Sequence, residues 1–183
     1  MGKFKKAIFW DRDGVINEIK VKNGVSLSPR RFSDFKIYPF IESIFDEFLR
    51  MGFLNIVFTN QPDISRKLMD LKELELMHEY LFKKVPISDI YVCPHSDHDK
   101  CSCRKPLPGM INSALEKYQL LPENCIVVGD RVTDIISGFR AGIENLFLLE
   151  RSYSFNRYLK KDLPIFKRIS DLTQMLEIIK KRK

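Results

Sequence analysis

The sequence lacks a long apolar segment. Its first apolar run, Ala7–Trp10, ends where Asp11 interrupts it. A secretory signal needs roughly 7–15 consecutive apolar residues, and a membrane-spanning helix needs about 20. Met1-Gly2 opens like a myristoylation signal, but Lys6 stands where that signal has Ser or Thr. We therefore expect a cytoplasmic protein with no membrane partner.

The sequence also lacks internal repeats and low-complexity linkers. Its 183 residues fit one globular domain, residues 1–183, that is long enough to bury a core. The formal net charge of +7 suits an anionic substrate or a nucleic acid. However, the chain has no obvious aromatic and basic surface for binding bases and phosphates. We therefore expect no nucleic-acid partner, and we interpret the basic segment Lys180–Lys183 as a helix end.

Cysteine is scarce and unevenly distributed. Of the four cysteines, Cys93, Cys101 and Cys103 lie in one short polar segment, and Cys125 stands alone before an apolar run. In a reducing compartment, clustered cysteines bind metals more often than they form disulfides. The cluster therefore predicts a metal site, whereas Cys125 is expected in the core.

Short apolar runs alternate with amphipathic stretches along the chain. The runs predict buried strands at Ala7–Trp10, Asn55–Thr59, Ile90–Cys93, Ile126–Gly129 and Asn145–Leu149. Apolar residues at helical spacing predict helices at Phe40–Met51, Asp70–Lys83, Gly109–Tyr118, Thr133–Ala141 and Ser170–Lys183. This alternation predicts an α/β fold, a doubly wound Rossmann-like parallel sheet with helices on both faces.

Polar or metal-binding side chains follow the predicted strands. In open α/β sheets the ligand binds beyond the carboxyl ends of the strands, where Asp11, Thr59, Cys93 and Asp130 stand. With Asp13 and Asp134, three or four carboxylates can meet at this edge and raise one another's pKa unless a cation neutralises them. Mg²⁺ is the natural cation for such oxygen ligands. The alternative, that each Asp only caps a helix, applies most to Asp134.

A phosphate ester repels an anionic nucleophile, so an enzyme must screen its oxygens with donors and cations. Thr59, Asn60 and Gln61 supply hydroxyl and amide groups at the end of the second strand. Lys105 supplies a point charge, and Arg104 supplies a further fork of donors. Together with the carboxylates, these residues form the set that a phosphatase needs.

Four segments resemble the ordered motifs of the haloacid dehalogenase (HAD) superfamily. They are Asp11-Arg12-Asp13-Gly14, Thr59-Asn60-Gln61, Arg104-Lys105-Pro106 and Gly129-Asp130-Arg131-x-x-Asp134, and they appear in the family's order. Each motif alone is weak, whereas the four together are highly specific. The resemblance implies a HAD-like fold and a phosphatase.

The resemblance also implies a role for each motif residue. Asp11 would attack phosphorus to form an aspartyl-phosphate, and Asp13 would act as general acid and then as general base. Phosphate and substrate would be bound by Thr59, Asn60, Gln61, Arg104, Lys105 and Arg131. Mg²⁺ would be held by Asp11, the backbone carbonyl of Asp13, and Asp130, while Asp134 would orient the site.

The cysteine cluster continues with a histidine. Cys93, His95, Cys101 and Cys103 supply three thiolates and an imidazole within eleven positions, a full ligand set for structural Zn²⁺. His98 is an alternative to His95 as the nitrogen ligand, and unliganded reduced cysteines are the alternative to zinc. His78 is interpreted as an ordinary helix residue. Because the cluster leads directly into Arg104, zinc is expected to order the segment that presents the phosphate-binding cations.

The segment Cys93–Met110 narrows the resemblance. It resembles the bacterial D-glycero-D-manno-heptose 1,7-bisphosphate phosphatase family, in which Cys-x-His and Cys-x-Cys-Arg-Lys-Pro precede Pro-Gly-Met. The related histidinol-phosphate phosphatases are an alternative, because the short zinc spacer and the segment Gly129–Asp134 also fit them. The loop Ile19–Arg31 departs from the substrate loop of the heptose family.

The resemblance therefore implies an enzyme that removes the C7 phosphate of a heptose 1,7-bisphosphate for lipopolysaccharide synthesis. The alternatives are a histidinol-phosphate phosphatase, a polynucleotide 3′-phosphatase and a non-catalytic, zinc-stabilised binding module. Only 46 residues separate Asp13 from Thr59, and another 46 separate Thr59 from Lys105, so no large cap domain is expected. Substrate selection is then expected from short loops, chiefly Asn17–Phe35, Pro62–Lys67 and the cysteine–histidine loop. We also expect a monomer whose partner is a small phosphorylated molecule.

Overall fold

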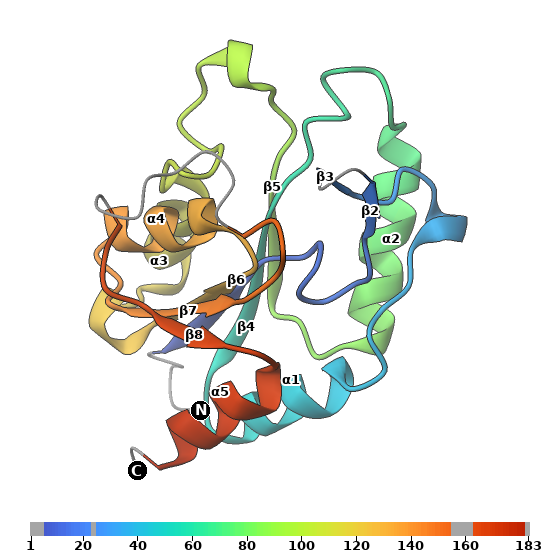
Figure 1. Cartoon of the computed structure of the whole chain (residues 1–183). Coiled ribbons are helices and arrows are strands. Elements are labelled where there is room, and N and C mark those ends of the chain that lie inside the picture. Colours follow the sequence, from blue (N-terminus) through green and yellow to red (C-terminus); the bar gives the residue numbers. More distant parts are fainter. Residues whose placement is uncertain (1–5, 23–24, 155–162, 182–183) are drawn as a thin grey trace.

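The computed structural model describes residues 6–22, 25–154 and 163–181. Its main feature is a six-stranded parallel sheet in the order β5-β4-β1-β6-β7-β8 (Figure 1). The strands are β1 (Ala7–Trp10), β4 (Leu54–Asn60), β5 (Asp89–Cys93), β6 (Ile126–Gly129), β7 (Asn145–Leu149) and β8 (Lys167–Ile169). The chain runs from β1 outwards to β5 and then returns to the other side of β1 with β6. Such a reversal leaves a ligand-binding crevice at the carboxyl ends of the central strands.

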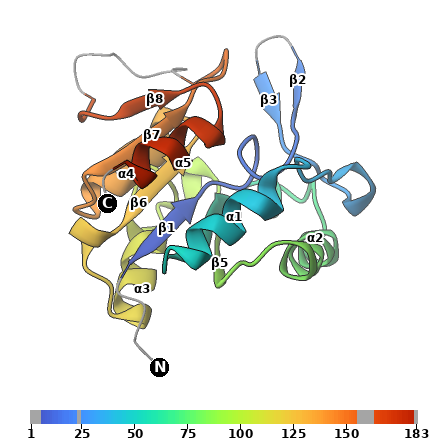
Figure 2. The same cartoon turned by 90° about the horizontal axis from the view of Figure 1, so that it is seen from below.

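Helices cover both faces of the sheet (Figures 1 and 2). One face is covered by α1 (Ile41–Arg50), α2 (Leu71–Lys84) and α5 (Leu172–Lys180), and the other by α3 (Gly109–Tyr118) and α4 (Val132–Arg140). In β1, the side chains of Ile8 and Trp10 join the first core, whereas Ala7 and Phe9 join the second. Because both faces are buried, β1 and β6 are apolar at every position, as their continuous apolar runs predict, while β4 carries the polar residues Asn55, Thr59 and Asn60.

The doubly wound α/β fold predicted from the sequence is confirmed. Each predicted strand and helix is present, and β1, β6, β7 and α3 have the predicted bounds. The last helix is shorter than predicted: Asp171 caps it by accepting a hydrogen bond from the Gln174 backbone N at 2.9 Å, and it ends at Lys180. Positions 182–183 of the predicted helix lie outside the described residues. Among the residues described, no helix is long and apolar enough to cross a membrane.

A small hairpin and an edge strand are not predicted by the sequence analysis. β2 (Lys20–Lys22) and β3 (Val25–Leu27) pair antiparallel, and β8 extends the sheet beyond β7. β2 is exposed along its whole length, and β8 is exposed at two of its three residues, so neither has the apolar pattern of a buried strand. In the described part of the chain between β1 and α1, only this hairpin and a short 3₁₀ helix, η1 (Phe32–Asp34), are formed, so there is no large cap.

One buried polar side chain joins three elements beneath the sheet. Asn55 in β4 is fully buried, and its Nδ2 donates to the backbone oxygens of Phe45 at 3.0 Å and Pro86 at 3.1 Å. Its Oδ1 accepts a hydrogen bond from Trp10 Nε1 at 3.1 Å. The amide thereby links β4 by hydrogen bonds to the indole of β1, to the middle of α1 and to the turn before β5.

Replacing this amide is expected to destabilise the fold. In Asn55→Ala the Trp10 indole N–H and the Pro86 carbonyl lose their partner, whereas the Phe45 carbonyl keeps its bond within α1; each unsatisfied buried group costs about 1–3 kcal/mol. We expect the free energy of unfolding, measured by urea denaturation, to fall by about 3 kcal/mol. The control Asn112→Ala, at an exposed position of α3, should change it by no more than about 0.5 kcal/mol. Equal effects of the two substitutions would show that the Asn55 contacts contribute little.

Candidate active site

Charged side chains are buried together at the carboxyl edge of the sheet. Asp11 follows β1, Asp130 follows β6, and Thr59 lies near the end of β4, so they come from three adjacent strands. Lys105, from the segment before α3, reaches the same place, and all four residues are at least 94% buried. The edge predicted from the strand ends is therefore a real cluster of charges.

Lys105 is the cation of this cluster. Its Nζ donates to Asp11 Oδ1 at 2.6 Å and to the Phe58 backbone oxygen at 3.0 Å, and it pairs with Asp134 Oδ1 at 2.7 Å. Burial would lower the pKa of Lys105, but the two carboxylates raise it above its ordinary value. Burial raises the pKa of Asp11 to about 6; Lys105 opposes this shift and Asp134 reinforces it.

Asn60 holds the backbone of Lys105 in place. Its Nδ2 donates to the Lys105 carbonyl at 3.2 Å, and its Oδ1 accepts from the Lys105 backbone N at 3.1 Å. The resemblance to the HAD superfamily implies that Asn60 binds phosphate. In the structure both ends of its amide are bound to Lys105, which fixes the cation beside β4.

The carboxylate of Asp13 lies in a ring of donors. It accepts hydrogen bonds from Arg12 Nε and Nη2 at 3.0–3.1 Å, from Asn17 Nδ2 at 3.0 Å and from Gln61 Nε2 at 2.8 Å. Burial alone would raise the pKa of Asp13, but the Arg12 guanidinium and the hydrogen bonds lower it below its ordinary value. Gln61 Nε2 also lies 2.8 Å from Thr59 Oγ1, so one amide positions both residues.

Three carboxylates lie close enough to share a cation. One oxygen from each of Asp11, Asp130 and Asp134 lies within 4.8 Å of the others. Asp130 Oδ2 accepts from the Tyr153 hydroxyl at 2.6 Å, while Oδ1 is buried and has no hydrogen-bond partner in the described structure. Burial and the neighbouring Asp11 and Asp134 raise the pKa of Asp130 well above its ordinary value. This hard, oxygen-only donor set, with one oxygen unpaired, fits Mg²⁺.

The close approach of Asp130 depends on a glycine. Gly14 has φ of +92°, and a Cβ at this position would lie 2.0 Å from Asp130 Oδ2 and 2.8 Å from the Tyr153 hydroxyl. No other residue fits there without moving the carboxylate.

Asp134 also caps α4, because its Oδ2 accepts from the Arg131 backbone N at 2.9 Å. The capping role and the place in the carboxylate cluster are therefore compatible.

The predicted zinc ligands also lie together. Cys93 Sγ lies 3.7 Å from both Cys101 Sγ and His95 Nδ1, and His95 Nδ1 lies 3.3 Å from Cys103 Sγ. In a tetrahedral site with Zn–S of about 2.3 Å, two thiolates stand about 3.8 Å apart. All three cysteines are free of disulfides, so the donor set and its spacing fit Zn²⁺. The nitrogen among the sulfurs belongs to His95, and His98 lies outside this group.

Two predicted phosphate-binding arginines have other partners in the structure. Arg104 Nε donates to Asp97 Oδ1 at 2.6 Å, and its Nη1 donates to the His95 carbonyl at 3.1 Å. Arg131 Nη2 donates to Ser26 Oγ in β3. Arg104 thus braces the cysteine–histidine loop, and Arg131 ties the hairpin to the segment after β6.

Three residues of the site escape the sequence analysis. Asn17 donates to Asp13, and Tyr153 donates to Asp130. Neither Asn17 nor Tyr153 belongs to one of the four motifs. His78 lies within α2, as expected for a helix residue, and its Nε2 also lies 3.1 Å from Arg12 Nη1, a contact that the sequence does not predict. Of these three residues, only Asn17 has a local signal in the sequence: it is a polar residue directly after the apolar pair Val15-Ile16.

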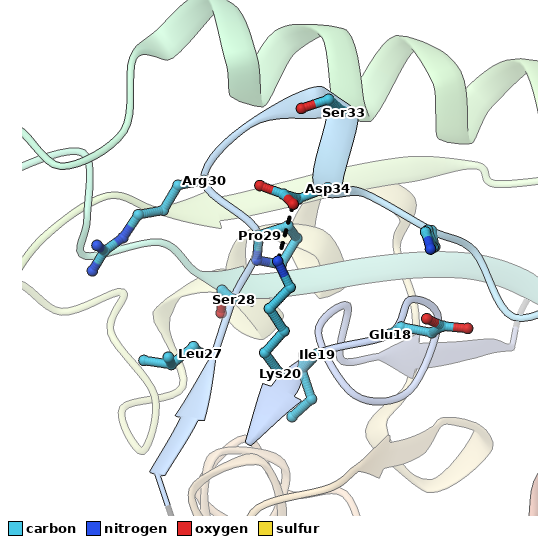
Figure 3. Close-up of a pocket in the computed structure, with 10 residues that line it drawn as sticks. Glu18, Ile19, Lys20, Leu27, Ser28, Pro29, Arg30, Ser33 and Asp34 are labelled. Atoms are coloured by element: carbon cyan, nitrogen blue, oxygen red, sulfur yellow. Dashed lines mark hydrogen bonds and ion pairs between the residues drawn. The ribbon is translucent and has the colours of Figure 1, made fainter. Parts of the chain in front are cut away.

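A hollow of about 400 Å³ adjoins this site (Figure 3). Its wall comes from the β2–β3 hairpin, η1 and the segments beside them. Lys20, Arg30 and Lys36 lie along it, with Lys20 paired to Asp34 at 3.0 Å and Arg30 held by Asp63 at 2.6 Å. Ser28 lines the hollow and also hydrogen-bonds to Asp13, so the hollow opens beside the acid–base candidate.

Known proteins resemble the chain over most of its length. A family model described as HAD-hydrolase-like matches residues 102–164. The D-glycero-beta-D-manno-heptose-1,7-bisphosphate 7-phosphatase of Helicobacter pylori is 33% identical over 150 residues, which cover 79% of this chain and 83% of the relative. The protein of the same name from Pasteurella multocida is 30% identical over 190 residues, which cover 96% of this chain and 99% of the relative. The D-glycero-alpha-D-manno-heptose-1,7-bisphosphate 7-phosphatase of Photorhabdus laumondii is 34% identical, covering 81% and 84%.

Solved structures share the fold. The D,D-heptose 1.7-bisphosphate phosphatase from B. bronchiseptica, complexed with magnesium and phosphate, matches with a TM-score of 0.82 at 24% identity. The match covers 98% of this chain and 99% of that one. A putative HAD-like phosphatase from Mesorhizobium loti matches with a TM-score of 0.73, also at 24% identity, covering 94% and 85%. At these identities the likeness establishes the fold alone.

The raised pKa values predict that protons and a divalent cation compete for the carboxylates. Mg²⁺ binds the ionised form, so its affinity should fall as the pH is lowered through the Asp11 pKa of about 6. Between about pH 7.5 and pH 5.5, Asp11 alone should weaken binding about fourfold, and Asp130 adds to this. Calorimetric titration of metal-free protein with Mg²⁺ in buffers of different ionisation enthalpy measures the affinity and the protons released. Equal affinity at both pH values would contradict the prediction.

Proposed function

We propose a substrate and a mechanism for this chain, which belongs to the HAD-like phosphatases and to the family of the D-glycero-D-manno-heptose-1,7-bisphosphate 7-phosphatases. It is a phosphatase, and its substrate would be a heptose 1,7-bisphosphate that loses its C7 phosphate. The observation that carries the substrate is the 30–34% identity to bacterial enzymes of that name over most of this chain. Their names include both anomers, so the proposal covers the sugar and its two phosphates and leaves the anomer open.

The proposed first step is attack by an Asp11 oxygen on the C7 phosphorus. The new bond joins Asp11 to phosphorus, and the bond from phosphorus to the sugar oxygen breaks. Lys105 would orient the Asp11 carboxylate and, with Thr59, hold the phosphoryl oxygens. Mg²⁺, held by Asp11, the Asp13 carbonyl and Asp130, would supply positive charge that screens the phosphoryl group.

Asp13 would give a proton to the departing sugar oxygen. Its pKa is lowered in the free protein, so the carboxyl must gain its proton when substrate binds. A phosphate dianion beside Asp13 favours this uptake, because a nearby negative charge raises the pKa of a carboxyl. In the second step the ionised Asp13 would take a proton from water, whose oxygen attacks phosphorus and releases phosphate from Asp11.

The rest of the substrate would occupy the hollow beside Asp13. Its volume of about 400 Å³ is within the range of small-molecule sites. Three cations, Lys20, Arg30 and Lys36, outnumber two acids, Glu18 and Asp34, along its wall, and this excess suits a sugar that carries a second phosphate. The residues that line this hollow belong to Asn17–Phe35 and Lys36, and Asn17–Phe35 is one of the three loop segments from which substrate selection is expected.

Substituting the nucleophile tests the enzyme and its substrate together. Asp11→Asn should lower phosphate release by about 10⁴-fold or more, because the amide cannot form the acyl phosphate. The control Asn112→Asp, an exposed substitution on α3, should leave the rate unchanged. Phosphate release is measured on a heptose 1,7-bisphosphate, histidinol phosphate and a 3′-phosphorylated oligonucleotide.

The parent protein should show its highest kcat/KM on the heptose bisphosphate. A higher kcat/KM on histidinol phosphate would reject the proposed substrate and leave the proposed mechanism intact. Undiminished turnover by Asp11→Asn would reject the mechanism.

We propose in addition that Cys93, His95, Cys101 and Cys103 hold a structural Zn²⁺. The ion would contact no substrate, because four protein ligands fill a tetrahedral site. Its effect would pass through Arg104, which braces the loop and precedes Lys105 directly. Zinc would thereby order the segment that carries the cation of the active site.

Loss of zinc is expected to weaken substrate binding while the magnesium requirement persists. Cys101→Ser should abolish bound zinc, lower the melting temperature and raise KM, with the Mg²⁺ concentration for half-maximal activity unchanged within about twofold. Zinc content is measured by elemental analysis. Cys125→Ser is the matched control for zinc content. Cys125 lies in the core, away from the cysteine–histidine cluster, so this variant protein should keep its bound zinc. A zinc-free protein with unchanged kcat and KM would contradict the proposed role of the loop.

A further inference from the structure

Arg12 is buried completely and is held on two sides. On one side its Nε and Nη2 donate to the carboxylate of Asp13. On the other side its Nη1 lies 3.1 Å from His78 Nε2, and its guanidinium carbon lies 5.5 Å from the centre of the Phe35 ring. The guanidinium is planar, so fixing one end of the plane fixes the direction of the other. The orientation of the Asp13 carboxylate is therefore coupled to His78.

The chemistry of this contact assigns a state to His78. A guanidinium can only donate, so His78 Nε2 must be the acceptor and the ring must be neutral, with its proton on Nδ1. Burial and the positive charge of Arg12 lower the pKa of His78 to about 3, which agrees with a neutral ring at physiological pH. The ring is thus a fixed acceptor and does not itself exchange protons with the substrate.

His78 is rigidly placed. It lies in the middle of α2, whose neighbouring residues Leu74, Met77 and Leu81 are buried in the core on that face of the sheet. The helix brings it to Arg12 across 66 residues of sequence. Without this acceptor, the Arg12 Nη1–H would be buried without a partner, and the guanidinium would turn towards other acceptors.

We infer that His78 is a positioning residue for the acid–base step, acting through Arg12 on the carboxylate of Asp13. This inference rests on the proposed role of Asp13 as general acid. A small misorientation of a proton donor lowers the rate of the step that uses it, while steps that need no proton transfer are spared. The expected defect of a His78 variant is therefore selective for the leaving group.

The experiment compares two substrates on the same preparations of protein. A heptose 1,7-bisphosphate or histidinol phosphate has an alkoxide leaving group that must be protonated, whereas p-nitrophenyl phosphate has a leaving group that departs without a proton. The readout is kcat/KM, which covers the steps up to departure of the leaving group. His78→Leu should lower kcat/KM for the alkyl ester about tenfold, a part of the 10²–10⁴-fold that general acid catalysis contributes. For p-nitrophenyl phosphate the decrease should be less than about twofold.

A matched set of variants separates positioning from damage to the fold. His78→Gln offers an amide oxygen as acceptor and should recover most of the activity on the alkyl ester. Glu79→Leu, an exposed neighbour on α2, should leave both substrates unchanged. Partial unfolding of His78→Leu would lower both rates by one factor, so the ratio of the two rates is independent of the folded fraction. A decrease of equal size on both substrates would overturn the inference.

The variant Asp13→Asn distinguishes a failure of the inference about His78 from a failure of the proposed general-acid role of Asp13. It should give the same selective defect as His78→Leu, but larger. If Asp13→Asn is selective and His78→Leu is not, His78 has no positioning role and the proposed function stands. If Asp13→Asn lowers both substrates equally, its role as general acid fails, and the inference about His78 is overturned with it.

Discussion

The interaction on which the site depends is the contact of one buried ammonium group, Lys105, with two buried carboxylates. Asp11, Asp130 and Asp134 lie within 4.8 Å of one another in a place that water hardly reaches. Removing one partner of such a buried group is costly, because a charge is left without compensation. Lys105 compensates one of the three negative charges and leaves two, which equals the charge of a divalent cation. Burial raises the pKa values of Asp11 and Asp130, and the neighbouring carboxylates raise them further.

The geometry of the fold makes that concentration of charge possible. Parallel strands bring Asp11 and Asp130 to one edge, because β1 and β6 are direct neighbours. Two glycines then allow the close approach: a Cβ on Gly14 would meet Asp130, and a Cβ on Gly129 would lie 2.3 Å from the side chain of Asp134. Asn60 anchors Lys105 from the neighbouring strand. The site is therefore built from short local features that a regular sheet places side by side.

Sequence patterns predict the parts that these local features determine. The continuous apolar runs predict the central strands, since burial on both faces favours apolar residues at nearly every position. The strand ends predict Asp11, Thr59 and Asp130. Contacts between distant side chains are not predicted, because residue type does not reveal which partner a side chain meets across 66 or 45 residues. The pairing of His78 with Arg12 and the clamp of Asn60 on Lys105 are of this kind. The β2–β3 hairpin is missed because its exposed strand carries no apolar pattern.

The residues proposed for the reaction and those proposed for substrate choice also differ in burial. Residues that would act on the phosphate are buried and have several partners each, so a change in one disturbs the others. Residues that line the hollow, such as Lys20 and Lys36, come from short, exposed segments and contribute little to the core. The ion pair of Arg30 with Asp63 joins this lining to the segment after β4. Exposed ion pairs of this kind are worth little to stability, so such segments can change without loss of the fold. The catalytic edge and the hollow are therefore separate parts of this chain, and the hollow is where the chain would determine its own substrate.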